Sequence, residues 1–170
     1  IVGVGLIGGS FALKCKKEGL SNRIIGVDNN PDHATKAIEL GLVDEMTDLA
    51  SAVEQADVII LSIPVNALSV LLPAILDLVD QQVVIDMGST KSHISAVVEN
   101  HPKRGRFVAS HPMWGTEYSG PAAAVENAFE NKAVILCDLD KSANDAVDIT
   151  RQLFKMINMN IFEITLFVGH

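Results

Sequence analysis

The sequence predicts an α/β fold with a doubly wound, mostly parallel sheet. Short runs of β-branched and apolar residues alternate with helical patterns along all 170 residues, which is typical of repeated strand–helix–strand units. A glycine-rich segment stands between the first apolar run and the first helical pattern. Several later runs end on polar residues, as expected at the edge of a parallel sheet where ligands bind.

Strands are predicted at the apolar runs, and helices are predicted between them. The expected strands cover residues 1–4, 23–27, a short segment near Val43, 58–62, 83–86, 107–110 and 133–137. Apolar residues at four-residue spacing from Ile7 to Cys15 predict the first helix, which Gly19 would end. Asn30 is expected to cap the second helix and Pro31 to open it. Further helical patterns occur at residues 67–78, 92–99 and 143–157.

Composition and charge favour one globular domain that acts on small molecules. Hydrophobic residues make up 48% of the chain and charged residues 20%, which is ordinary for a globular domain. The formal net charge of -8 provides no basic surface for nucleic acid or anionic lipid. The apolar run at residues 58–61 is far shorter than the roughly 20 residues of a membrane span. We therefore expect neither nucleic acid nor membrane as a partner.

The cysteines and histidines show no metal-binding or disulfide pattern. Cys15 and Cys137 lack the spacing of a disulfide framework, so a reducing, cytoplasmic compartment is expected. His33, His93 and His101 have no metal-ligand partner at useful spacing. We expect no metal ion, and the motifs of zinc proteases, glycosidases and common serine hydrolases are absent from the sequence.

Gly3, Gly5 and Gly8 form a GxGxxG motif that leaves a predicted strand and enters a predicted helix. In a Rossmann-type domain the first glycine permits a tight turn and the second lets the backbone approach a pyrophosphate. The third lets the helix lie close to the sheet. The free N–H groups around Leu6 and Ile7 would face the phosphates. The alternative is a glycine-rich turn that serves close packing alone.

Asp28 ends the second predicted strand, about 20 residues after the last glycine of the motif. A carboxylate there can accept hydrogen bonds from the adenosine ribose and would repel a 2′-phosphate, so NAD is favoured over NADP. Ser62 ends the fourth predicted strand and Pro64 follows it, at the same edge of the sheet. Pro64 is expected to line the dinucleotide crevice, although a proline there also serves as a strand terminator.

Two further strand ends bring Ser89 and His111 to that edge. Oxidation of an alcohol by NAD needs a base for the hydroxyl proton, and histidine suits this role because its ordinary pKa is near neutrality. His111 is therefore the first candidate for a catalytic base. Ser89 could bond the same hydroxyl or hold the imidazole tautomer, or it could simply cap the following helix.

Three segments together resemble the prephenate and arogenate dehydrogenases of tyrosine biosynthesis: GVGLIGGS at residues 3–10, DMGSTK at 86–91 and SHPMWGTEYSG at 110–120. The resemblance implies NAD-dependent oxidative decarboxylation of prephenate to 4-hydroxyphenylpyruvate, or the corresponding reaction of arogenate. It implies that His111 accepts the hydrogen bond of the substrate hydroxyl and that Ser89 aligns both groups. It also implies that Thr116 and Glu117 lie at the rim of the substrate site.

The same resemblance implies a domain organisation. Residues 1–165 would form the NAD-binding domain, and residues 166–170 would begin the junction to a helical dimerisation domain that completes the substrate pocket. The full-length protein would be a homodimer, and this chain alone would be inactive.

Two other functions remain compatible with the first motif. One is a different NAD-dependent dehydrogenase, of the type that acts on β-hydroxy acids. The other is an NAD-binding module that senses redox state without catalysis, which would need the glycine motif and Asp28 but not Ser89 or His111.

Overall fold

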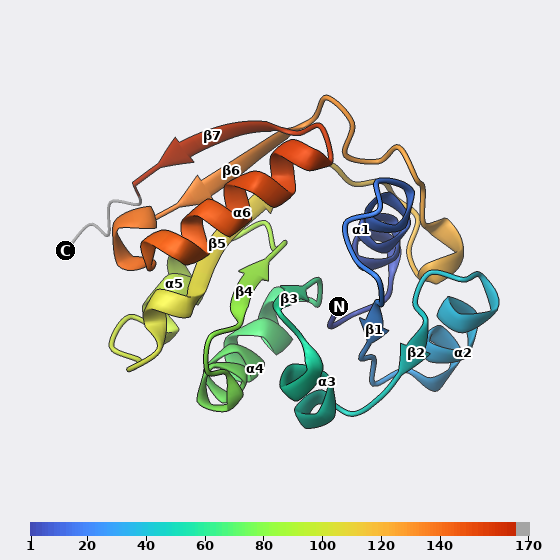
Figure 1. Cartoon of the computed structure of the whole chain (residues 1–170), viewed down its shortest axis with the longest axis horizontal. Coiled ribbons are helices and arrows are strands. Elements are labelled where there is room, and N and C mark those ends of the chain that lie inside the picture. The colour runs from blue at the N-terminus through green and yellow to red at the C-terminus, as the bar shows by residue number, and fades with distance from the viewer. Residues whose placement is uncertain (166–170) are drawn as a thin grey trace.

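A mostly parallel sheet carries helices on both faces in the computed structural model, which describes residues 1–165 (Figure 1). Five strands lie side by side in the order β3 (Val58–Leu61), β4 (Val83–Asp86), β5 (Phe107–Pro112), β6 (Ala133–Cys137) and β7 (Asn160–Ile164). A parallel pair, β1 (Ile25–Gly26) and β2 (Glu45–Met46), continues the sheet beyond β3. The predicted doubly wound α/β class is confirmed.

Val2 joins the two groups of strands. It forms parallel bridges with Val27 on one side and with Leu61 on the other. The predicted first strand is thus reduced to pairing around Val2, because Gly3 adopts a φ of +88° and leaves the extended conformation. The segment before the glycine motif lies in the middle of the sheet, as a dinucleotide-binding turn requires.

The direction of the strands decides which side chains meet. β4 runs parallel to β3 and β5, so the carboxyl ends of these strands share one edge. β6 runs antiparallel to β5, with Ala109 opposite Cys137 and His111 opposite Ile135. Asp86 and His111, the last or nearly last residues of their strands, therefore lie at the edge where the glycine motif begins.

Six α-helices connect the described strands. They are α1 (Leu6–Lys17), α2 (Pro31–Glu39), α3 (Leu49–Gln55), α4 (Val65–Leu78), α5 (Ser92–Val97) and α6 (Asn144–Met156). Asn30 caps α2 as predicted, since its side chain accepts hydrogen bonds from the N–H groups of Asp32 and His33 at 2.9 and 3.3 Å. Gly19, with a φ of +64°, follows the end of α1. No helix of the described chain is both long and apolar enough to cross a bilayer.

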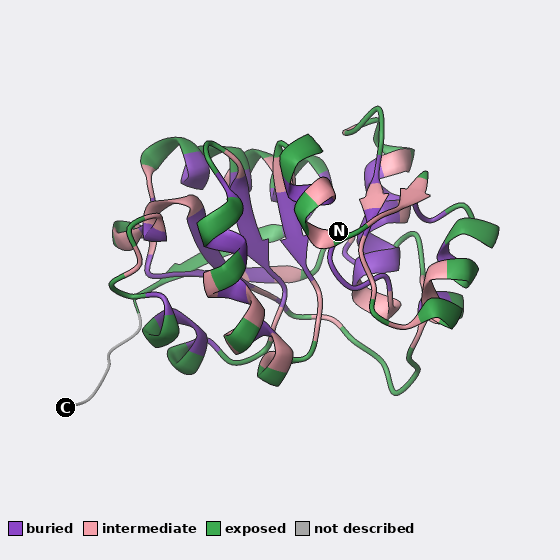
Figure 2. Cartoon of the chain, turned by 90° about the horizontal axis from the view of Figure 1, so that it is seen from below, coloured by how far each residue is buried: buried purple, intermediate pink, exposed green. Residues whose placement is uncertain are grey.

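The sheet separates two hydrophobic cores because successive side chains of a strand point to opposite faces. Ile60 faces a core that includes Phe11 of α1 and Phe154 of α6. Its neighbours on β3, by contrast, face a core built with helices α3, α4 and α5. Figure 2 shows the buried strands between helices whose outer surfaces are exposed.

Strand β7 was not predicted from the sequence. It pairs in parallel with β6 at the outer edge of the sheet, and four of its five residues are exposed. An edge strand with little burial shows no clear apolar alternation, which is why the pattern did not reveal it. An ion pair between Arg151 and Glu163 ties it to α6, with 2.7 Å between Nε and Oε1. The junction predicted for residues 166–170 lies outside the described residues.

Candidate nucleotide-binding and catalytic site

Gly3 and Gly8 are glycines because the backbone is crowded around them. A Cβ on Gly3 would lie 2.5 Å from the carbonyl oxygen of Ser62, and Gly3 also has a positive φ. A Cβ on Gly8 would lie 2.0 Å from the carbonyl oxygen of Gly3 and 2.4 Å from Ser62 Oγ. The geometry agrees with a tight turn at Gly3 and with close contact of helix α1 and the sheet at Gly8.

Gly5 differs from these two because a Cβ on it would meet no protein atom within 4 Å. It occupies the N-cap of α1, which has no side-chain cap and no acidic residue in its first turn. The first N–H groups of the helix, at Leu6 and Ile7, have no acceptor within the helix. Open space, free donors and the positive end of the helix dipole together suit a phosphate group.

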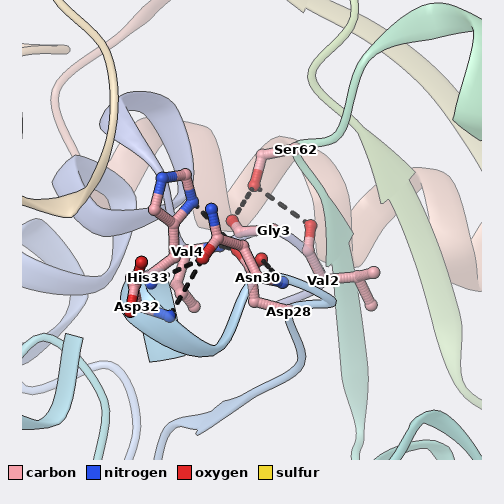
Figure 3. A network of polar contacts seen from close by, with 8 residues as sticks. All are labelled: Val2, Gly3, Val4, Asp28, Asn30, Asp32, His33 and Ser62. Carbon is pink, nitrogen blue, oxygen red and sulfur yellow. Dashed lines mark hydrogen bonds and ion pairs between the residues drawn. The ribbon is translucent and has the colours of Figure 1, made fainter. Parts of the chain in front are cut away.

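Asp28 is held in place by two backbone donors (Figure 3). Its Oδ2 accepts a hydrogen bond from Val4 N at 3.0 Å, and its Oδ1 accepts one from Asn30 N at 2.9 Å. His33 Nδ1 lies 3.8 Å from Oδ2. Each carboxylate oxygen can accept a second hydrogen bond, so the group can still receive ribose hydroxyls.

Ser62 supports the glycine turn from the neighbouring strand (Figure 3). Its hydroxyl donates to the carbonyl oxygen of Gly3 at 2.7 Å. Pro64 is exposed at the N-cap of α4, and its role in the crevice stays a prediction. Ile63, which the sequence did not single out, lies nearer the turn, because a Cβ on Gly3 would be 2.8 Å from Ile63 Cγ2.

His111 is the penultimate residue of β5, and its side chain is partly exposed. Its Nδ1 is buried and has no hydrogen-bond partner among the described residues. Burial, followed by the positive charge of Lys91, lowers the pKa of His111, whereas Asp86 acts in the opposite direction. A lowered pKa keeps the imidazole neutral near pH 7, which is the form that can accept a proton.

A buried ion pair between Asp86 and Lys91 lies beside this histidine, and the sequence had not assigned it a role. Asp86 Oδ1 also accepts a hydrogen bond from Ser110 N at 3.0 Å, and Oδ2 accepts one from Gly88 N at 3.2 Å. Burial raises the pKa of Asp86 and lowers that of Lys91, while their mutual attraction opposes both shifts. Both residues belong to the DMGSTK segment. This motif was therefore the feature of the sequence that could have indicated a role for them.

Ser89 is exposed on the loop between Asp86 and Lys91. Within the described chain it makes no hydrogen bond to His111, and it does not cap α5, whose N-cap position is Lys91. Helix capping, the simpler explanation for this serine, therefore does not account for it. Its alignment of the substrate hydroxyl stays a prediction.

Thr116 and Glu117 lie exposed on the segment that follows β5. Thr116 Oγ1 accepts a hydrogen bond from Tyr118 N at 3.2 Å. Trp114, at the start of this segment, packs edge-to-face on Phe129 with ring centroids 5.7 Å apart. The segment is thereby anchored to the core, while its tip is left accessible.

A cavity of about 210 Å³ lies away from these residues, at the amino ends of the strands. Its lining includes Ile1, Arg23, Asp57 and Leu153, and none of the predicted site residues. Because ligands of open α/β sheets bind at the carboxyl ends of the strands, we do not assign the nucleotide to this cavity.

The glycine turn into α1, the anchored Asp28 and the polar carboxyl edge of the sheet define a nucleotide-binding domain of the Rossmann-type dehydrogenases. Comparison with known families makes the assignment more specific. Residues 11–163 match the family model of the prephenate dehydrogenase nucleotide-binding domain, and the chain belongs to this family.

Three relatives illustrate the match. The prephenate dehydrogenase of Bacillus subtilis is 36% identical over 169 residues, which cover 97% of this chain and 46% of that protein. The crystal structure of prephenate dehydrogenase from Aquifex aeolicus is 32% identical with a TM-score of 0.89, over 97% of this chain and 60% of that one. Synechocystis arogenate dehydrogenase is 28% identical with a TM-score of 0.86, over 96% and 58% of the two chains. The chain spans about half the length of the curated relatives it matches.

Proposed function

We propose that this chain is the NAD-binding portion of a prephenate dehydrogenase that works in tyrosine biosynthesis. The observation that carries the proposal is the family match over residues 11–163. The proposed reaction is the oxidative decarboxylation of prephenate to 4-hydroxyphenylpyruvate. The two free, buried cysteines of the described chain fit the reducing cytoplasm in which such biosynthesis takes place.

The residues at the glycine turn fit a dinucleotide. The open space at Gly5 and the free N–H groups at the start of α1 would receive the pyrophosphate. Asp28 would receive the adenosine ribose and repel the 2′-phosphate of NADP. A structure of the Aquifex aeolicus relative in complex with hydroxyphenyl propionate and NAD⁺ supports this choice of cofactor. NAD⁺, when bound, supplies the hydride acceptor.

His111 acts as the base of the reaction. It takes the proton of the ring hydroxyl while the carbinol C–H bond gives up its electrons as hydride. The ring carboxylate leaves as carbon dioxide, and the electrons of the broken C–C bond complete the aromatic ring and pass to the ring oxygen. His111 then returns its proton to that oxygen, which gives the phenol hydroxyl of 4-hydroxyphenylpyruvate. Ser89 hydrogen-bonds the same hydroxyl, and Thr116 and Glu117 lie at the rim of the substrate site.

The remainder of the protein completes the site. Because the chain corresponds to about half of its curated relatives, we assign the substrate carboxylates to side chains outside it. The intact protein is a homodimer that does not bind nucleic acid. The 170-residue chain by itself binds NAD without turning over prephenate.

The test is turnover by the intact protein with prephenate or arogenate, followed by NADH absorbance. His111→Asn should lower kcat by roughly 10²- to 10⁴-fold with little change in NAD affinity, because a single positioned base contributes this much. His93→Asn, at an exposed histidine of α5, is the matched control and should keep full activity. Full turnover by His111→Asn would refute the assignment of the base, and turnover of arogenate alone would refute the assigned substrate.

A further inference from the structure

The ion pair of Asp86 and Lys91 is buried to a degree that stability alone does not explain. The Asp86 side chain is 0% exposed and that of Lys91 is 6% exposed. Removing two charges from water is costly, and well-packed apolar side chains are often as stable or more stable at such positions. A buried pair of this kind therefore calls for a role besides stability.

The pair is connected to both candidate catalytic residues. Two hydrogen bonds join Asp86 to Ser110: the Asp86 carboxylate oxygen Oδ1 accepts from Ser110 N, and the Asp86 backbone carbonyl oxygen accepts from the Ser110 hydroxyl. Ser110 immediately precedes His111 on β5. Asp86 Oδ2 accepts from Gly88 N, next to Ser89. The carboxylate thus fixes the strand that carries His111 and the loop that carries Ser89.

The pair also sets the electric field at His111. Among the described residues, the charges that act on this imidazole come from Lys91, just before α5, and from Asp86, at the end of β4. The third neighbouring element, β6, places the uncharged Ile135 opposite it. Cys137, further along β6, remains a neutral thiol because burial raises its pKa. The effect of Lys91 exceeds that of Asp86, so the pair favours the uncharged imidazole.

We propose that Lys91 and Asp86 are positioning residues, which orient His111 and the Ser89 loop and provide the charges that surround the His111 imidazole. This inference rests on the proposed role of His111 as the base. The main alternative to this positioning role is that Lys91 binds a substrate carboxylate directly. The burial of the ammonium group and its contact with Asp86 argue against that role, because the charge is already paired inside the protein.

The test compares the NMR titration of the His111 imidazole with the pH profile of kcat/KM in the intact protein. The resonance of His111 is assigned by its loss in His111→Asn. Lys91→Met should raise the pKa of His111, because a nearby positive charge is removed, and Lys91→Arg should restore the parent value. The acid limb of kcat/KM should move to higher pH in Lys91→Met. Its kcat should fall on the order of 10²-fold, because small displacements of reacting groups cost this much.

Two further variants serve as controls for the effect of Lys91→Met on His111. Asp86→Asn/Lys91→Met removes both charges at once and avoids an unpaired buried carboxylate, so it should fold even if Lys91→Met does not. It should also raise the pKa of His111, since the effect of Lys91 is the larger of the two. Lys14→Met removes another buried ammonium, paired with Glu18 on α1, and should leave the titration of His111 unchanged.

An unmoved His111 titration in the folded double variant would overturn the proposal. A higher KM with an unchanged pH profile in Lys91→Met would also overturn it, and would assign Lys91 to substrate binding. The role of His111 as the base and the positioning role of Asp86 and Lys91 can be refuted independently. An unmoved titration overturns the positioning role even if His111→Asn is inactive, whereas full turnover by His111→Asn overturns the role of the base whatever the titration shows.

Discussion

Asp28 accepts a hydrogen bond from the backbone N–H of Val4, with 3.0 Å between Val4 N and Asp28 Oδ2. This bond connects the segment that follows β1 to the turn that leads into α1. The carboxylate proposed to bind the ribose therefore also supports the backbone proposed to bind the pyrophosphate. A change at Asp28 should disturb both parts of the nucleotide site.

Asp28→Asn should weaken NAD binding roughly ten- to a hundredfold, because a hydrogen bond to a charged group contributes about 1.5–3 kcal/mol. Binding of NADP should weaken less, because the repulsion of its 2′-phosphate is lost along with the ribose contacts. Calorimetric titration with both dinucleotides measures the two effects. Asp32→Asn, on the exposed first turn of α2, is the control and should leave both affinities near the parent values. Equal losses for NAD and NADP would contradict a role in cofactor choice.

Gly5→Ala and Gly8→Ala should separate nucleotide binding from stability. The new Cβ at position 5 meets no protein atom, so the free energy of unfolding should change by less than about 1 kcal/mol. NAD affinity should nevertheless fall, because the methyl group enters the space proposed for the pyrophosphate. At position 8 the Cβ would collide with backbone, and the protein should lose about 3 kcal/mol of stability.

The measurements are thermal unfolding and NAD titration of each variant. Gly105→Ala, where the Cβ would be 3.5 Å from its nearest neighbour, Ala143 N, should change neither quantity. Undiminished NAD affinity in Gly5→Ala would place the pyrophosphate elsewhere.

The pH dependence of the activity proposed for the intact protein should reflect the environment of His111. Burial and Lys91 lower the pKa of this imidazole from its ordinary value of 6.5, so the neutral form persists to a lower pH than in an exposed histidine. The acid limb of kcat/KM should therefore lie below pH 6.5. The neutral, buried form also contributes stability above the unfolded-state pKa, and this contribution is lost as the pH falls through the folded-state pKa. An acid limb above pH 6.5 that His111→Asn abolishes would contradict the direction of the shift.

Local patterns predicted much of this fold. The apolar runs at 83–86 and 133–137 coincide with β4 and β6, because buried strands read as short β-branched segments between turns. The glycine motif and Asp28 were found for a similar reason, since their spacing along the chain is part of the binding turn itself. Strand β7 escaped detection because exposed edge residues leave no periodic signal.

By itself, the sequence determined the fold class, the turn for the dinucleotide and the candidate base, because each depends on residue types at short spacing along the chain. Only the tertiary structure decided that β6 runs antiparallel to β5 and that Asp28 holds the glycine turn. It also decided that Asp86 and Lys91 form a buried pair beside His111. These features arise from contacts between segments far apart in the chain, whose burial and field at a given atom exist only once the strands are packed together.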